Sequence, residues 1–138
     1  MNGMTARIGV GLYVDDIDKM VSFYRDTLEF ETEHGGLFAQ CKTKSGPVSL
    51  FMYDKKEFVK SIGEPYHPSS GINTTMEIAV WLPSFSDVDD EYKRLMELGI
   101  KSLTGEPITY AWGIRCFYIA DPEGNLLEIG STGKDDTR

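Results

Sequence analysis

The segment VGLYVDDIDKMVSFYRDTLEF, residues 10–30, decides the fold because a strand pattern leads directly into a helix pattern. The stretch IGVGLYV (8–14) alternates and is rich in β-forming residues, so it predicts a strand. Asp16 is placed to cap a helix. The apolar residues of that helix follow at helical spacing: Ile17, Met20, Val21, Tyr24 and Leu28. This part of the chain is therefore predicted to form a strand–helix unit.

A second strand–helix unit lies 68 residues further along the chain. MEIAVWL (76–82) predicts its strand, Ser86 with Asp89 has the S-x-x-D form of a capping box, and Gly99 is placed to end the helix. The shift of 68 superimposes residues 10–14 on 78–82, 24–25 on 92–93 and 28–30 on 96–98. Duplication of one half-length module is the simplest explanation.

The two halves also end alike. TKSGPVSLFM (43–52) and DPEGNLLEIG (121–130) each place a glycine-centred turn before a strand, at an offset of 78. The intervening stretches, 31–43 and 100–120, have room for two further strands each. Each half is therefore predicted to be a βαβββ module in an α+β fold.

The 138 residues are predicted to form a single domain, 1–138, made of these two modules. The first module covers about 6–54 and the second about 74–131. The segment 55–73, rich in Pro, Gly and Ser, is interpreted as a connector, and 132–138 as a disordered polar tail.

Composition limits the partners. The net charge of −8 argues against nucleic acid and anionic membrane, which both need a field of Lys and Arg, and favours a neutral or cationic small molecule. No apolar run reaches the length of a signal peptide or a membrane span. Cys41 and Cys116 lie in apolar, strand-like runs without a CxxC pair, so they are predicted to be reduced and buried in a cytoplasmic protein.

Alternation along the strands separates two sheet faces. In the first strand Val10, Leu12 and Val14 are predicted to pack on the helix, which leaves Gly9, Gly11 and Tyr13 on the open face. The matching open-face residues of the second module are Glu77, Ala79 and Trp81.

The last strand of each module follows the same rule. Leu127 and Ile129 are predicted to face the helix and Glu128 the open side. The offset of 78 would then put Leu50 and Met52, together with Val48, on the open side of the first module. If the two sheets curl around a central cavity, four related positions line it: Gly9, Leu50, Glu77 and Glu128. Such a cavity would explain an acid within an apolar run.

At these residues the chain resembles the vicinal oxygen chelate superfamily, which includes glyoxalase I, extradiol dioxygenases and bleomycin-resistance proteins. The first strand and helix, 10–30, look like that family's first strand and helix, and WGIRCFYIADPEGNLLEIG (112–130) looks like its last hairpin. The resemblance covers nearly the whole chain. It implies mixed sheets around a central cavity, a small-molecule ligand or substrate, and a homodimer.

Metal-dependent members hold a divalent ion with His, Gln or Glu at the four related positions. Carried over to this chain, only Glu77 and Glu128 have donor side chains, because the other two positions are Gly9 and Leu50. Firm catalytic binding usually needs three or more protein donors. The resemblance therefore implies either no cofactor or a divalent metal in a degenerate site held by these two glutamates.

Three hypotheses for function remain open. In the first, the protein binds or sequesters an aromatic or cationic small molecule through the two glutamates and an aromatic wall. The ligand-binding residues would be Tyr13, Leu50, Met52, Glu77, Trp81, Trp112, Arg115 and Glu128, with Tyr110 as a further candidate. Trp112 could equally be an ordinary packing residue at a strand end.

The second hypothesis is an enzyme, a glyoxalase-like lyase or isomerase or a dioxygenase. It would depend on metal in a degenerate site, or use Glu77 or Glu128 as a metal-free general base. Two carboxylates that converge in a partly apolar cleft raise each other's proton affinity, which suits a base. In the third hypothesis Arg115 or backbone donors satisfy both acids, and the site has no ligand.

Overall fold

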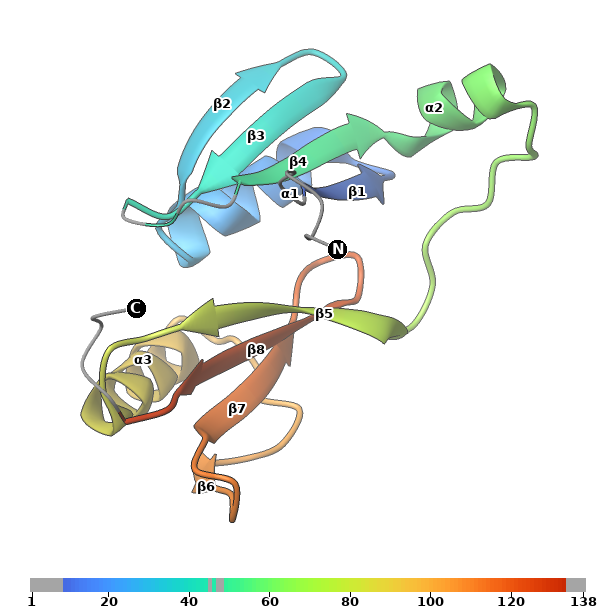
Figure 1. Ribbon diagram of the computed structural model, residues 1–138. Coiled ribbons are helices and arrows are strands. Elements are labelled where there is room, and N and C mark those ends of the chain that lie inside the picture. The colour runs from blue at the N-terminus through green and yellow to red at the C-terminus, as the bar shows by residue number, and fades with distance from the viewer. Residues whose placement is uncertain (1–8, 45, 47–48, 134–138) are drawn as a thin grey trace, which may run out of the picture. The chain divides into compact units, whose positions relative to one another are not determined.

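The computed structural model describes residues 9–44, 46 and 49–133, and the chain divides into two compact units, Met1–Ser69 and Ser70–Arg138 (Figure 1). We call them unit 1 and unit 2. Ile8, Val48 and residues 134–138, for which the sequence predicts strand, open-face and tail positions, lie outside the described residues.

Unit 1 is a four-stranded mixed sheet with strand order β1-β4-β3-β2. β1 pairs with β4 in parallel, and the other two pairings are antiparallel. Its elements are β1 (Val10–Val14), α1 (Ile17–Ser22), the π-helical turn η1 (Phe23–Thr27), β2 (Glu31–Gly35), β3 (Phe38–Lys42), β4 (Ser49–Asp54) and α2 (Lys55–Ile62).

Unit 2 repeats this topology with strand order β5-β8-β7-β6 and a parallel β5–β8 pair. Its elements are β5 (Asn73–Trp81), α3 (Phe85–Glu97), β6 (Ile108–Thr109), β7 (Arg115–Ala120) and β8 (Asn125–Ser131). Two four-stranded mixed sheets with helices confirm the predicted α+β class and the βαβββ repeat.

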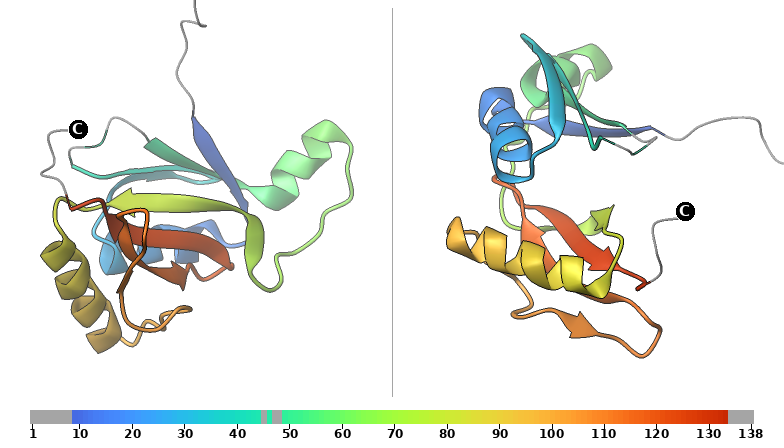
Figure 2. Two further views of the ribbon diagram at one scale, coloured as in Figure 1. Left: turned by 60° about the horizontal axis from the view of Figure 1, so that its bottom comes forward. Right: turned by 90° about the vertical axis from the view of Figure 1, so that its left-hand side faces the viewer.

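One helix covers one face of each sheet, α1 in unit 1 and α3 in unit 2 (Figure 2). The alternation predicted for β1 is confirmed, because Leu12 and Val14 are buried and Gly11 and Tyr13 are exposed. In unit 2 six apolar side chains of α3, β7 and β8 are buried between the helix and the sheet: Val88, Leu95, Phe117, Ile119, Leu127 and Ile129. Burial of these apolar surfaces is what holds each helix to its sheet.

Both helix starts are capped by a side chain. Asp16 accepts the backbone N–H of Lys19 at 3.0 Å, as predicted. In α3 the cap is Ser84, which forms a full capping box with Asp87. The prediction of Ser86 with Asp89 was therefore wrong by two residues. Gly99, at φ +84°, follows the last turn of α3 as predicted, because glycine adopts this left-handed conformation without strain.

The predicted connector contains a helix. Asp54 caps α2 by accepting the N–H of Glu57 at 2.9 Å, and Gly63 ends the helix at φ +79°. The remaining connector is tied to the end of β1, because Asp15 accepts hydrogen bonds from the Tyr66 hydroxyl (2.7 Å) and the Ser69 N–H (2.6 Å). The two caps therefore stabilise a helix in a segment whose Pro, Gly and Ser content predicts a loop.

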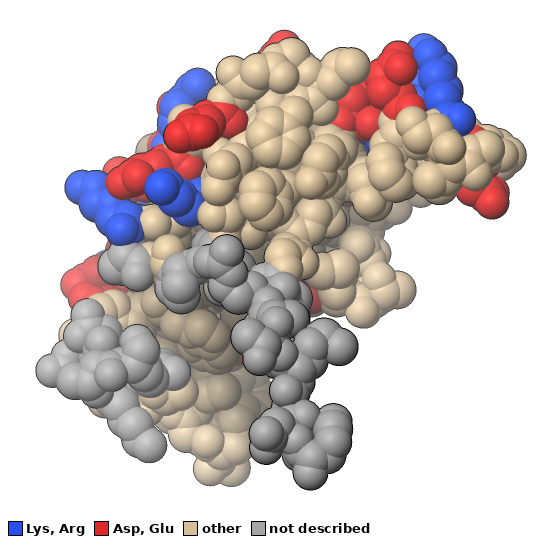
Figure 3. Space-filling model, turned by 45° about the horizontal axis from the view of Figure 1, so that its top comes forward, with Lys and Arg blue, Asp and Glu red and all other residues tan. Residues whose placement is uncertain are grey.

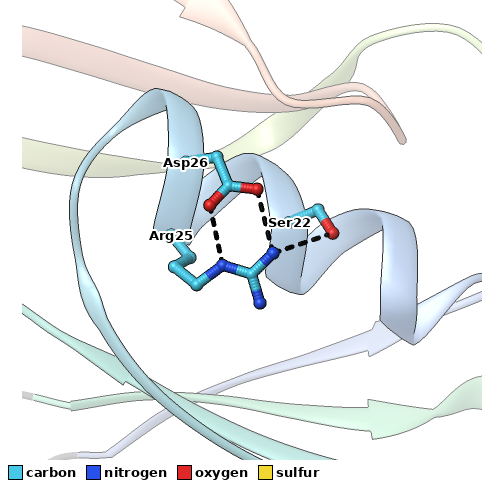
Figure 4. A network of polar contacts seen from close by, with 3 residues as sticks. All are labelled: Ser22, Arg25 and Asp26. Atoms are coloured by element: carbon cyan, nitrogen blue, oxygen red, sulfur yellow. Dashed lines mark hydrogen bonds and ion pairs between the residues drawn. The ribbon is translucent and has the colours of Figure 1, made fainter.

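The first helix of unit 1 widens into the π-helical turn η1, whereas α3 is α-helical over its whole length. At this turn Arg25 forms a two-point ion pair with Asp26 (2.7 and 2.9 Å), and its Nη2 lies 3.4 Å from the Ser22 hydroxyl (Figure 4). The Arg25–Asp26 ion pair is exposed to solvent, so it contributes little to the stability of the π-helical turn.

Candidate functional site

The turn before β8 sets where Glu128 points. Both Asp121 carboxylate oxygens are used: Oδ1 accepts the N–H groups of Glu123 (3.0 Å) and Asn125 (2.9 Å), and Oδ2 accepts the Asn125 amide (2.9 Å). Gly124 has φ +88°, and a Cβ there would collide with the carbonyl of Gly71. The DPEGN sequence is thus a structural device that fixes the register of β8 against β5.

In that register Glu77 and Glu128 lie on the same face of the sheet. Glu77 pairs with Leu126, and Ala79 pairs with Glu128, so both acids point away from α3. Glu128 is only 7% exposed, whereas Glu77 is exposed to solvent. This side, which we call the acidic face, therefore presents one buried and one accessible carboxyl group.

The carboxyl of Glu128 hydrogen-bonds with that of Glu77 and with the Cys116 thiol. Burial first, and then the hydrogen bond with Glu77, raises the pKa of Glu128 to about 7. Two facing carboxylates repel each other, so a proton held between them is favoured. Near neutral pH the acidic face can therefore hold or release a proton.

Two side chains of the neighbouring strand β7, Cys116 and Tyr118, lie on the same face as the two acids. Tyr118 pairs with Glu128 across the ladder, and its hydroxyl lies 3.5 Å from Oε1 of Glu77. Burial, with the nearby charges of Glu128 and Glu77, raises the pKa of Tyr118 to about 12, and burial raises that of Cys116 to about 11. Both groups therefore stay protonated and act as hydrogen-bond donors to the acids. Both cysteines of the chain are free and buried, as predicted.

Trp81 flanks the acids on the same face. It pairs with Gly130, and a Cβ at Gly130 would lie 3.3 Å from Cζ3 of the Trp81 ring and 3.0 Å from the Cβ of Cys116. The glycine lets the indole approach β8, the strand that carries Glu128, and 45% of Trp81 remains exposed. An aromatic surface thus adjoins the carboxyl pair.

Trp112 and Arg115 have different surroundings from those of the acids. Trp112 is 71% exposed and stacks on Tyr110 with ring centroids 4.7 Å apart. Arg115 lies on the opposite side of β7 and pairs with Asp89 of α3 (2.8 Å) and the Thr109 hydroxyl (2.9 Å). The hypothesis that Arg115 neutralises the two glutamates was therefore wrong.

In unit 1 the predicted faces of β4 were also wrong. Val10 pairs with Leu50 and Leu12 with Met52, so these β4 residues face α1 and are 5% and 0% exposed. The offset of 78 was one residue too long. A slip of one residue turns every side chain of a strand to the other face.

The open face of unit 1 carries aromatic rings instead. Phe51 and Tyr53 pair with Gly11 and Tyr13, and Phe38 adjoins them from β3. The Tyr13 ring stacks on Phe58 of α2 at 4.1 Å. Figure 3 shows a broad uncharged area of the surface with acidic and basic side chains at its margins. Tyr13 is thus on the open face as predicted, in a mainly aromatic layer.

The donor set does not fit a three-donor metal centre. At the related positions of unit 1, Gly9 has no side chain and Phe51 has no donor atom, and the acidic face of unit 2 provides two carboxyl groups that share a hydrogen bond. Over residues 9–44, 46 and 49–133, no three His, Cys, Asp or Glu side chains are grouped so that they could hold a metal ion.

Sequence reasoning missed four open-face residues: Phe51, Tyr53, Cys116 and Tyr118. The alternation rule applied to RCFYIA would have placed Cys116 and Tyr118 beside Glu128. Aligning β4 to β8 by their pairing with β1 and β5 would have matched Phe51 to Glu128.

The fold and the acidic face define the class of protein. A family model for the Glyoxalase/Bleomycin resistance protein/Dioxygenase superfamily matches residues 7–129, and the chain belongs to this superfamily. Among curated proteins it is similar to the uncharacterized protein YraH of Bacillus subtilis (strain 168), at 28% identity over 127 residues, which cover 87% of this chain and 93% of YraH.

Two solved structures are also similar. A glyoxalase/bleomycin resistance protein/dioxygenase from Nocardioides matches with a TM-score of 0.75 at 25% identity, over 99% of this chain and 89% of that one. A lactoylglutathione lyase from Agrobacterium tumefaciens matches with a TM-score of 0.71 at 25% identity, over 94% and 96%. Within the described part of the chain, none of the helices has the length and apolar character needed to cross a bilayer.

Proposed function

We propose that this protein binds a small molecule that combines a cationic group with an aromatic or apolar body, and that unit 2 is the binding surface. The observation that carries the proposal is the buried Glu128 carboxyl against the accessible Glu77 carboxyl, on a face that Trp81 adjoins. Carboxylates attract the cation, and the indole offers apolar and cation–π contact. The net charge of −8 favours capture of a basic ligand.

Aromatic primary amines test this proposal. We expect 2-naphthylmethylamine, titrated into the ¹⁵N-labelled full chain, to shift the amide signals of β5, β7 and β8 and the indole signal of Trp81 saturably. The variants Glu77→Gln and Glu128→Gln should weaken binding about tenfold each, because each removes one charge-assisted hydrogen bond.

Glu97→Gln is the matched control, because it makes the same change in charge at an exposed position near the end of α3. It should bind like the parent protein. Equal affinity in all four proteins, or the absence of saturable shifts, would contradict the proposal.

A metal-free proton transfer is the second candidate. It is supported by the pKa of Glu128, raised to about 7, because a general base acts best when its pKa lies near the working pH. In this role Glu128 would take a proton from a bound substrate, and Tyr118 would orient Glu77. Turnover of a carbonyl substrate that fails in Glu128→Gln would support it.

Superfamily membership also supports a ligand shared with a second copy of the chain in a homodimer. Light scattering on a size-exclusion column tests this part of the proposal. A mass that matches one chain at all concentrations would contradict it.

A further inference from the structure

We propose that the chain bends between its two units at a short hinge, Ser70 and Gly71, and that Asp15 sets the length of this hinge. The connector runs as a coil from the end of α2 to the start of β5 (Figure 1). Hydrogen bonds tie its first part to unit 1, and its last part lies against unit 2. The boundary between the two compact units falls between these two attachments, after Ser69.

The first attachment is a pair of hydrogen bonds from Tyr66 and Ser69 to Asp15, which we call the Asp15 clasp. The two carboxylate oxygens are used separately: Oδ1 accepts the Tyr66 hydroxyl at 2.7 Å, and Oδ2 accepts the Ser69 N–H at 2.6 Å. Burial opposes ionisation, but these hydrogen bonds and the charge of Lys55 lower the pKa of Asp15. The carboxylate is therefore ionised at neutral pH, and both hydrogen bonds are of the strong, charge-assisted kind.

The second attachment is the DPEGN turn of unit 2. The N–H of Asn73 donates to the carbonyl of Gly124 at 2.8 Å. The space that a Cβ at Gly124 would need is occupied by the carbonyl oxygen of Gly71. The backbone of the connector is thus in close contact with unit 2 from the Gly71 carbonyl onward.

Between these attachments the backbone has few rotatable bonds. The Ser69 N–H and the Gly71 carbonyl are held by different units, so the rotatable bonds between them belong to Ser69, Ser70 and Gly71 alone. Ser70 is exposed, and within the described part of the chain no hydrogen bond or ion pair holds it. Gly71 is exposed with φ +67°, and a Cβ there would meet no atom within 4 Å. Because glycine changes its backbone angles at little steric cost, the chain can bend at this point.

Asp15 determines how much of the connector takes part in this movement. While the Asp15 clasp is formed, the connector is attached to unit 1 up to Ser69. Without the clasp, the connector is held at the end of α2, where the Glu64 N–H donates to the Val59 carbonyl at 3.1 Å. The segment that can rotate then grows from residues 70–71 to residues 65–71. Each added residue brings further backbone freedom, so the two units should sample a wider range of relative orientations.

Chymotrypsin tests the Asp15 clasp, because it cleaves after aromatic residues and Tyr66 is the only aromatic residue between α2 and β5. We expect Asp15→Ala, which loses both hydrogen bonds, to be cut after Tyr66 about tenfold faster than the parent protein. Tyr66→Phe keeps a cleavable residue and loses only the hydroxyl bond, so its increase should be about threefold. Fragment masses identify the cleaved bond, and peptides of residues 61–71 with Tyr or Phe at position 66 correct for the preference of the protease.

Asp90→Ala is the matched control, because it makes the same change at an exposed position of α3 in unit 2. It should be cut after Tyr66 at the rate of the parent protein. Circular dichroism checks that each variant is folded. Tyr66→Phe changes an exposed residue outside both sheets, so it tests the Asp15 clasp even if Asp15→Ala does not fold.

Spin labels on the full chain measure the hinge itself. Cysteines would replace Lys19 of α1 and Lys93 of α3, which are both exposed. Cys41 and Cys116 should stay unlabelled, because they are buried and their pKa values are raised to about 11. Labelled chains are diluted with unlabelled chains, so that double electron–electron resonance measures distances within one chain.

A label pair within unit 1, on Lys19→Cys and Lys56→Cys, provides the reference width. We expect the distribution of distances between the units to be broader than this reference. In Asp15→Ala it should be about twofold broader again, because the spread of a flexible segment grows with the square root of its length. Asp90→Ala should leave it unchanged.

A distribution between the units as narrow as the reference within unit 1 would overturn the hinge. Equal widths in Asp15→Ala and the parent protein would overturn the role of Asp15, and so would equal rates of cleavage after Tyr66. Both measurements use the protein without a ligand, so their outcome does not depend on the proposed function.

Discussion

The two units share one topology but present different chemistry on their open faces. Each has a parallel pair of strands, β1 with β4 and β5 with β8, and each buries the other face under a helix. In unit 1 the position that pairs with Gly11 is Phe51, and in unit 2 the position that pairs with Ala79 is Glu128. Equivalent positions in the two sheets thus carry an aromatic ring in unit 1 and a buried acid in unit 2.

This difference separates the requirements of folding from those of function. The helix-facing residues are apolar in both units because they supply the burial that stabilises the fold. The open-face residues contribute little to that core, so their chemistry could diverge after duplication. Glu128 lowers stability when it is ionised, which is the expected cost of a functional group in a partly apolar site.

Acid substitutions in β4 test the register behind this comparison, and they carry the largest expected effect. Leu50→Glu should destabilise the chain by about 4 kcal/mol or more, because Leu50 is 5% exposed on the side that faces α1. Phe51→Glu should cost only about 1–2 kcal/mol, since Phe51 is half-buried on the open face. Urea unfolding measures both, and a larger loss for Phe51→Glu would refute the register.

Glu128→Gln should change how stability depends on pH. The pKa of Glu128 rises from an ordinary 4.5 to about 7 on folding, so the folded state binds more protons between these values. The stability of the parent protein should therefore fall as pH rises from about 5 to 7 and level off above.

In Glu128→Gln this contribution is absent, so the variant should gain on the order of 3 kcal/mol relative to the parent between pH 5 and pH 8. Denaturant unfolding at both pH values provides the measurement, with Glu97→Gln as the matched control. A difference between Glu128→Gln and the parent protein that does not change with pH would contradict the raised pKa.

Two glycines on the open faces should respond differently to alanine. In Gly130→Ala the new Cβ meets the Arg115 carbonyl at 3.3 Å and the Cys116 Cβ at 3.0 Å, so we expect a loss of about 1–2 kcal/mol and altered Trp81 fluorescence. In Gly11→Ala it meets the outer edge of the Tyr53 ring at 3.1 Å, which can move, and unit 2 has Ala79 at this position.

Gly11→Ala should therefore change stability by about 0.5 kcal/mol or less, because alanine loses less backbone entropy than glycine in a strand. Thermal unfolding of Gly130→Ala and Gly11→Ala measures whether the first variant loses more stability than the second. Equal losses would show that the two open faces are packed equally tightly.

Substitutions of the helix caps carry the smallest expected effect on stability. Ser84→Ala should cost about 1 kcal/mol, because Ser84 accepts the Asp87 N–H at 3.1 Å, whereas Ser86→Ala should stay within about 0.5 kcal/mol. Asp16→Ala in unit 1 should match Ser84→Ala, since the shift of 68 residues places these two caps on each other. The reverse order of losses would restore Ser86 as the cap.

How far the sequence predicts this fold depends on the range of the interactions involved. Periodicity located both strand–helix units, because apolar spacing reports directly which side of an element is buried. The α2 helix was missed, since its signals, Asp54 and Gly63, are two single caps in a segment of loop-like composition. The Ser84 cap was missed although the repeat itself pointed to it through Asp16.

The candidate site was predictable in unit 2 and not in unit 1. Alternation along NLLEIGS placed Glu128 beside Glu77 correctly, because the DPEGN turn leads directly into the strand. More residues separate β3 from β4 than separate β7 from β8, so an alignment made on the glycines slipped by one residue and misplaced Leu50 and Met52. Register depends on which strand pairs with which, and that is a long-range contact.

By itself the sequence determined the doubled βαβββ pattern, the helix-facing core of unit 2 and the presence of two acids on one sheet face. These properties follow from local periodicity, which each segment carries independently of the others. Only the tertiary structure decided that Phe51 is the unit 1 equivalent of Glu128 and that Arg115 pairs with Asp89. It also decided that Cys116 and Glu77 interact with Glu128. The physical reason is that pairing register and burial arise between strands distant in the chain, where no local pattern records them.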